Sequence, residues 1–98
     1  MAGRIEGFEW VDVLLDKIRA KHGVEPEHVE SALLNADPPP LIRKAQEGKY
    51  RAWAQVEGDG QYLFVVFSMP EHNVARVISA RLMTSHEKSI YHKWIAGK

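Results

Sequence analysis

Two arginines interrupt an otherwise apolar stretch at residues 74–81. Because side chains of a β-strand alternate between its two faces, this spacing predicts Arg76 on one face and Arg81 on the other. A guanidinium is costly to bury alone, so it needs a carboxylate, a backbone carbonyl or a phosphate from outside the protein. The sequence leaves open whether these arginines form internal ion pairs or bind an external anion.

The composition predicts a single domain, residues 1–98, with one modest core. Thirteen Lys and Arg residues balance thirteen Asp and Glu residues, so any binding of a polyanion must rest on local basic patches. The absence of cysteine excludes disulfides and thiol chemistry and is compatible with a reducing cytosol. With no apolar stretch of membrane-spanning length and no signal-peptide core, we expect a soluble cytoplasmic protein with no membrane contact.

Hydrophobic spacing predicts two helices in the N-terminal third. Apolar residues recur at helical spacing over residues 11–22, and Gly23 supplies the left-handed residue that commonly ends a helix. Pro26 suits the first position of a second helix, which is predicted to end near Asn35. The two helices are therefore joined by a tight corner.

Strands follow the helices. The prolines at 38–40 predict an extended connector that reaches Gly48 with at most a short edge strand. Longer strands, joined by turns at 58–60 and 69–73, are predicted at residues 50–56, 62–67 and 74–81. The second of these is apolar throughout and should be covered on both faces.

A capping box at Thr84 and Glu87 predicts the start of a last helix. The residues expected on one face of this helix are Glu87, Ile90, Tyr91 and Trp94. The predicted fold is therefore α+β: two N-terminal helices, a three- to four-stranded antiparallel sheet and a C-terminal helix.

Short motifs from residue 5 to residue 91 form a series in a fixed order. They are Phe8-Glu9-Trp10, Lys21-His22-Gly23-Val24, Pro26-Glu27, Val29-Glu30, Gly48-Lys49-Tyr50-Arg51, the strand 60–67, and residues 76–81 followed by Met83-Thr84, Glu87 and Tyr91. In this order and spacing they resemble the BrnT family of bacterial toxins, which are small ribonucleases with a RelE-like fold. The chain departs from the family in having Val11 after the tryptophan, where many members have Asp, and in its neutral charge.

The resemblance implies partners as well as a fold. It implies an RNA substrate and a BrnA-like ribbon-helix-helix antitoxin, in an assembly that is either a homodimer or a toxin–antitoxin heterotetramer. The rival interpretation is a module of the same fold that has little or no nuclease activity and binds a protein or RNA, and the neutral charge favours this rival.

The resemblance also implies metal-independent cleavage of RNA. That reaction needs deprotonation of the 2′-hydroxyl, stabilisation of the phosphorane charge and protonation of the leaving 5′-oxygen. Arginine suits the second task because it stays charged and can bind two phosphate oxygens at once. We therefore expect Arg51 and Arg81 to contact phosphate, and Arg76 is the next candidate. The alternative for Arg76 is an ion pair with Glu27 or Glu30 on the helix layer.

Other candidates follow from the same resemblance. His22 is the candidate proton shuttle, and Glu27 is the candidate general base. Their structural alternatives are capping of the last helical carbonyls for His22 and a helix-dipole contact for Glu27. The further candidates for RNA contact are Lys21, Ser79 and Tyr91. Ser79 has the alternative of bonding to nearby backbone, and the Tyr91 ring is expected to pack on the sheet with its hydroxyl towards a substrate groove.

We expect no cofactor and no metal site. The five histidines show no HExxH arrangement, and the chain has no thiol. A Gly-x-Ser-x-Gly elbow and a glycine-rich phosphate loop are absent from the sequence as well.

Overall fold

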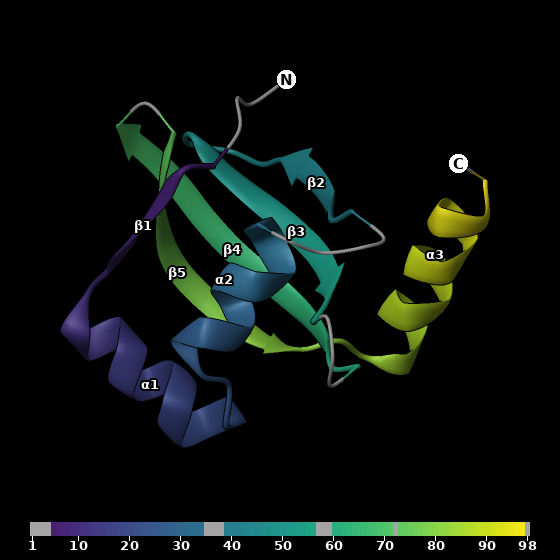
Figure 1. Ribbon diagram of the computed structural model, residues 1–98, viewed down its shortest axis with the longest axis horizontal. Helices are drawn as coiled ribbons and strands as arrows, with labels where there is room; N and C mark the ends of the chain where they lie inside the picture. The colour runs from purple at the N-terminus through teal and green to yellow at the C-terminus, as the bar shows by residue number, and fades with distance from the viewer. Residues whose placement is uncertain (1–4, 35–38, 57–59, 72, 98) are drawn as a thin grey trace.

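A computed structural model describes residues 5–34, 39–56, 60–71 and 73–97, with the side chain of His22 excepted. The elements, in chain order, are β1 (Gly7–Trp10), α1 (Asp12–His22), α2 (Pro26–Leu34), β2 (Leu41–Lys44), β3 (Lys49–Gln55), β4 (Tyr62–Glu71), β5 (Val74–Leu82) and α3 (Ser85–Ala96). The strands form one sheet in the order β1-β5-β4-β3-β2. Helices α1 and α2 lie against one face of this sheet, and α3 stands apart from them at the other end of the molecule (Figure 1).

The three predicted helices are present, and the α+β class is confirmed. The predicted short edge strand exists as β2, which pairs antiparallel with β3. The prediction of a three- to four-stranded, wholly antiparallel sheet is wrong, because the sheet has five strands and β1 runs parallel to β5. Parts of two predicted features, the helix end near Asn35 and the turn at 58–60, lie outside the described residues.

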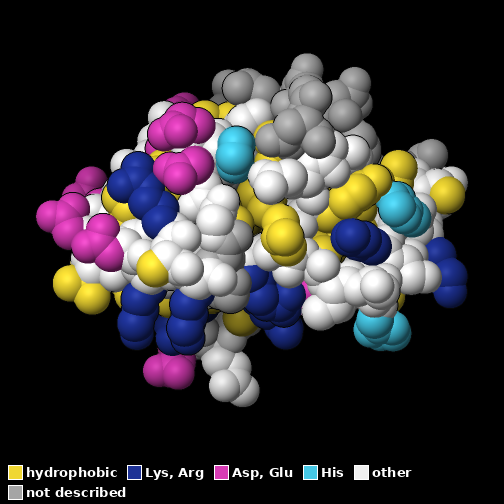
Figure 2. Space-filling model, turned by 90° about the horizontal axis from the view of Figure 1, so that it is seen from below, with side chains coloured by type: hydrophobic (Ala, Val, Ile, Leu, Met, Phe, Trp, Pro, Cys, Tyr) yellow, Lys and Arg dark blue, Asp and Glu magenta, His cyan; other side chains and the backbone are white. Residues whose placement is uncertain are grey.

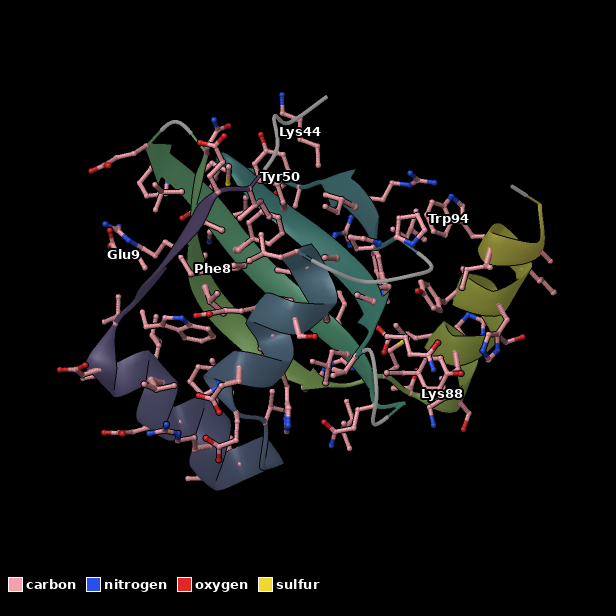
Figure 3. All side chains as sticks on the ribbon, viewed as in Figure 1. Phe8, Glu9, Lys44, Tyr50, Lys88 and Trp94 are labelled. Atoms are coloured by element: carbon pink, nitrogen blue, oxygen red, sulfur yellow. The ribbon has the colours of Figure 1, made fainter. Side chains whose placement is uncertain are left out.

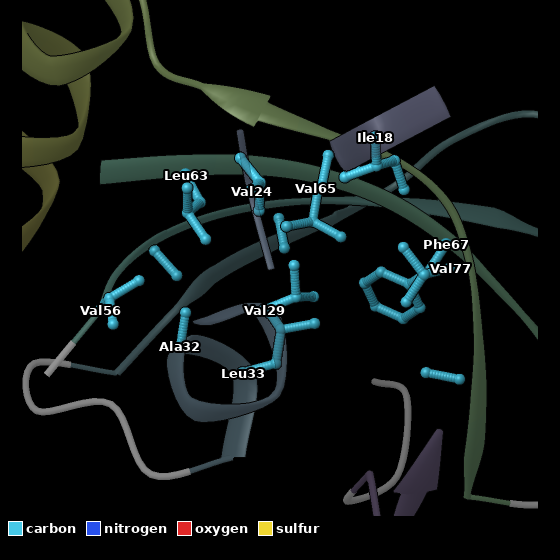
Figure 4. Packing of buried hydrophobic residues seen from close by; sticks show 14 of the residues in the cluster. Ile18, Val24, Val29, Ala32, Leu33, Val56, Leu63, Val65, Phe67 and Val77 are labelled. Carbon is cyan, nitrogen blue, oxygen red and sulfur yellow. The ribbon is translucent and has the colours of Figure 1, made fainter. Parts of the chain in front are cut away.

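The main core lies between the helix pair and the sheet (Figure 4). Gly23 ends α1 with φ 62°, and its N–H donates to the carbonyl oxygen of Arg19 at 3.0 Å. This left-handed residue turns the chain so that Val24 and Val29 are fully buried against the sheet. The sheet side of this core includes Leu63, Val65 and Phe67 of β4, which alternate along the strand and are all buried.

A smaller core lies on the opposite face, where α3 packs. Tyr91 is fully buried there together with Leu41 and Met83, and Trp53 and Phe64 pack against them. Ile90, which was predicted to share a face of α3 with Tyr91 and Trp94, remains 48% exposed. The capping box that starts α3 is confirmed, with both the Thr84 and the Glu87 hydrogen bonds present.

Helix α3 covers only part of this second face. Phe64 and Val66 of β4 are half-buried, so the expected burial of β4 on both faces is incomplete. The part of the sheet beyond α3 presents side chains of β2, β3 and β5 to solvent. No helix in the described part of the chain is long and apolar enough to span a membrane.

Candidate nucleic-acid interface

Strand β5 contains a β-bulge that changes where its arginines point. Val66 of β4 faces Ser79, but the next residue, Phe67, faces Val77, so one extra residue, Ile78, is inserted into β5. Arg76 and Arg81 are an odd number of residues apart, and strict alternation would place them on opposite faces. Because the bulge adds one residue, both face away from α1 and α2, and the prediction of opposite faces is wrong.

We call the sheet face opposite α1 and α2 the open face. The strand register brings four residues into one row across it, Arg43, Arg51, Val66 and Ser79. A second row, about 7 Å away along the strands, contains Leu41, Trp53, Phe64 and Arg81. A third row, on the other side of the first, contains Lys49, Ser68, Arg76 and Glu9. The first row is therefore flanked by basic residues on both sides.

Arg81 and Glu87 form the best-defined contact on the open face. Arg81 donates from Nη1 to Oε1 of Glu87 at 2.8 Å and from Nη2 to Oε2 at 3.0 Å, and Nη1 also donates to the carbonyl oxygen of Leu82 at 3.0 Å. The guanidinium carbon lies 4.4 Å from the ring centroid of Phe64. These contacts fix the orientation of a guanidinium that remains 34% exposed.

The Glu87 carboxylate accepts from two further groups. The backbone N–H of Thr84 donates to Oε1 at 2.9 Å, and Nε1 of Trp53 donates to Oε2 at 3.3 Å. The hydrogen bonds from Arg81, and those from Thr84 and Trp53, lower the pKa of Glu87 to about 2, against the opposing effect of burial. The same pair raises the pKa of Arg81. Glu87 is therefore ionised at neutral pH and is a poor general base.

Arg76 also has a carboxylate partner. Its Nε lies 2.6 Å from Oε1 of Glu9, which is its register partner on β1. The alternative pairing with Glu27 or Glu30 is wrong, because those residues belong to α2 on the other face, and Glu30 instead accepts from Nε1 of Trp10 at 2.8 Å. Arg76 is about half exposed and can still reach an anion on the open face.

Arg43 and Arg51 face each other across the β2–β3 pair, and both are exposed. The guanidinium of Arg51 lies 5.9 Å from the ring centroid of Trp53, and no ion pair of either arginine is found among the described residues. Like charges directly opposite each other on neighbouring strands repel, so an anion between them would be stabilising. The sequence predicted at most a short edge strand here and did not single out this pair, because a four-residue strand is too short for its periodicity to be read.

The charges of the molecule are separated by face. The described open face carries five cations and the carboxylates of Glu9, Glu71 and Glu87, whereas residues 12–34 of the helix layer contain five acidic residues and three basic ones. In Figure 2, Asp and Glu side chains are concentrated at the left, and several Lys and Arg side chains line the lower edge. A chain with zero net charge can therefore still present a basic surface to a polyanion.

Comparison with known proteins places this geometry in a family. A family model described as "Ribonuclease toxin, BrnT, of type II toxin-antitoxin system" matches residues 15–87. The chain belongs to this family. Among solved structures, the Brucella abortus ribonuclease toxin BrnT is similar in fold, with a TM-score of 0.65 and 18% identity over 81% of this chain and 97% of that chain. A search of curated proteins gives no match.

The remaining candidates of this BrnT family member fall in three places. Ser79 lies on the open face beside Val66. Lys21 and Glu27 are exposed on α1 and α2, on the opposite side of the sheet, and the side chain of His22 lies outside the described residues. Tyr91 is fully buried, and burial raises its pKa, so its hydroxyl lies in the smaller core and not at a substrate groove. The structure thus brings Arg51, Arg76, Ser79 and Arg81 to one face.

Proposed function

We propose that this BrnT family member is an endoribonuclease toxin that binds the RNA backbone on the open face. The observation that supports this proposal is the gathering of four arginines, from β2, β3 and β5, on the one sheet face that α1 and α2 leave uncovered. Arginine grips phosphate through two N–H groups at once and keeps its charge at any physiological pH. The shared face gives an incoming strand several phosphate contacts.

Within this proposal, Arg51 and Arg81 stabilise the charge that develops on the phosphorane. Arg81 suits the task because Glu87 and Phe64 hold its guanidinium in place before substrate arrives. Arg51 suits it because it is exposed and comes from a different strand, so it can contact a second oxygen or the next phosphate. Arg76 and Ser79 provide further backbone contacts. Electrostatic stabilisation of this kind requires no metal ion.

The proposal also determines which of the other predicted site residues take part and how an antitoxin would act. Lys21, His22 and Glu27 are not used in it, because α1 and α2 lie on the other face of the sheet. A BrnA-like ribbon-helix-helix antitoxin would neutralise the enzyme by covering the open face with an acidic segment. The RelE-like mode of acid–base cleavage, and action on RNA in the cytoplasm, follow from the family resemblance.

The proposal is tested by incubating the purified protein with labelled single-stranded RNA in the presence of a metal chelator. We expect wild-type protein to cleave, and Arg51→Ala and Arg81→Ala each to reduce kcat/KM by on the order of 100-fold, as for loss of one donor to a developing oxyanion. Lys17→Ala removes one positive charge from the helix layer and is the matched control, which should cleave as wild type does. Equal activity of all three variants would contradict the proposal, as would a wild-type protein without activity.

A further inference from the structure

Cleavage on the open face needs a proton donor for the leaving 5′-oxygen. Of the three carboxylates described on this face, Glu9 and Glu87 are each held by an arginine, and Glu71 lies at the end of β4 far from Phe64 and Arg81. Glu87 is already ionised at neutral pH, so it has no proton to give. Tyr91 of α3 is fully buried in the smaller core and cannot touch substrate. The proton must therefore come from another group at the border of the open face.

A histidine and a tyrosine form a hydrogen-bonded pair at this border. Nε2 of His92 in α3 lies 3.0 Å from the hydroxyl oxygen of Tyr62, the first residue of β4. The two rings meet edge to face with their centroids 5.2 Å apart. Lys88, one turn earlier at the foot of α3 (Figure 3), places Nζ 5.6 Å from the Tyr62 ring centroid. His92 and Lys88 are exposed, so a substrate can approach the pair.

Two separate observations place the Tyr62–His92 pair next to the Arg81–Glu87 contact. Tyr62 and Phe64 are two residues apart on β4, so they turn to the same face about 7 Å from each other, and Arg81 stacks on Phe64. Along α3, Lys88 directly follows Glu87, which holds the Arg81 guanidinium. The Tyr62–His92 pair and Lys88 therefore border the Arg81–Glu87 contact. In Figure 2, His side chains and a Lys or Arg side chain lie together on the right of the surface.

We propose, on the basis of the function above, that Tyr62 and His92 form a proton relay to the leaving group. The 2′-oxygen bonds to phosphorus, and the 2′-hydroxyl proton passes to water. The bond between phosphorus and the 5′-oxygen breaks, and its electron pair stays on the 5′-oxygen. That oxygen takes the hydroxyl proton of Tyr62, and Tyr62 takes the Nε2 proton of the His92 imidazolium, which is left neutral and regains a proton from water. The products are a 2′,3′-cyclic phosphate and a free 5′-hydroxyl.

The roles of the two residues differ. Tyr62 touches the reacting oxygen and is the catalytic residue, whereas His92 acts through it and is a positioning residue that also resupplies the proton. An imidazole suits this place because its ring nitrogen can both donate and accept a proton. Lys88 holds the phosphate on the substrate side of the pair and takes no proton.

A change of leaving group tests the relay. In RNA with sulfur in place of the bridging 5′-oxygen, the leaving thiolate is stable without a proton. We expect Tyr62→Phe and His92→Gln to cleave ordinary RNA about 100-fold more slowly than wild type and the sulfur-substituted RNA within about threefold of wild type. His86→Gln, an exposed histidine of the same helix, is the control and should match wild type on both substrates.

Each other outcome is decisive. Wild-type rates for Tyr62→Phe or His92→Gln on ordinary RNA would overturn the relay while leaving the proposed function intact. An equal loss on both substrates would also overturn it, because a defect in folding or binding slows both alike. If wild-type protein cleaves neither RNA, the proposed function fails, and the relay fails with it.

Discussion

At the scale of single residues, Glu87 has three structural roles in one carboxylate. It completes the capping box of α3, holds the guanidinium of Arg81 and accepts from the indole N–H of Trp53. Its side chain is only 17% exposed, so these donors replace most of its contact with water. The residue that was predicted as a cap is therefore also the partner that fixes the best-oriented arginine of the open face.

We expect Glu87→Gln to lower the free energy of unfolding at neutral pH by about 1–2 kcal/mol, because a charge-assisted pair and part of the cap are lost. The pKa of Glu87 is lowered to about 2 in the folded chain, so its contribution is present above its ordinary value near 4.5 and is lost as pH falls towards 2. Denaturant unfolding between pH 2 and pH 7 measures this. The variant should show a shallower loss of stability over that range than wild type.

Glu71→Gln is the matched control for this experiment, because Glu71 is exposed near the end of β4 and its neutralisation should leave the pH dependence unchanged. If Glu87→Gln and wild type lose stability in parallel as the pH falls, the low pKa of Glu87 is not a source of stability.

At the scale of elements, the sequence predicted correctly those features that depend on residues close together in the chain. The glycine at the end of α1, the capping box of α3 and the alternation along β3 each involve residues less than about ten apart, and all three are present. The bulge at Ile78 was not predictable in this way, because it is defined by which residues of β4 face β5. The alternation rule therefore failed at Arg76 and Arg81, where it mattered most for the site.

Strand β1 was missed for a related reason. Its four residues, Gly7–Trp10, carry too short a pattern to be read as a strand, and their position comes from parallel pairing with β5, more than sixty residues later in the chain. The same pairing places Glu9 beside Arg76, a contact that the sequence assigned to the helix layer. Four of the predicted site residues, Arg51, Arg76, Ser79 and Arg81, lie on one face, which the sequence could not show.

The corner between α1 and α2 offers a test at this scale. Gly23 has φ 62°, and a built Cβ would meet no atom within 4 Å, so Gly23→Ala would cost stability through backbone strain alone. We expect a loss of about 1 kcal/mol in the free energy of unfolding. Gly7→Ala is the control. A Cβ built at Gly7 would also meet no atom within 4 Å, but Gly7 has no positive φ, so this variant should change the free energy of unfolding by less than about 0.5 kcal/mol. Equal losses in the two variants would show that strain at Gly23 is not the cause.

At the scale of the whole molecule, the proposed binding of RNA depends on the separation of charge between the two faces. Zero net charge predicts little long-range attraction to a polyanion, and it is this property that favoured a binding module over a nuclease. The proposed function meets this difficulty locally, because the acidic excess of α1 and α2 lies on the face opposite the arginines. Association with RNA should therefore depend on orientation and should involve few phosphates.

The number of phosphates that the protein contacts can be measured from how its affinity for RNA changes with salt concentration. If Arg43, Arg51, Arg76 and Arg81 each neutralise one phosphate of a single strand, a plot of log Kobs against log salt should have a slope of about −3. Arg43→Ala should make that slope shallower by about 0.7, because one counterion fewer is displaced from the strand. Lys17→Ala removes the same charge from the helix layer and should leave the slope unchanged. If the slope changes equally in both variants, RNA binding depends on the total charge of the chain and not on the open face. If it changes in Arg43→Ala alone, RNA binds at the row of residues that crosses β2, β3, β4 and β5.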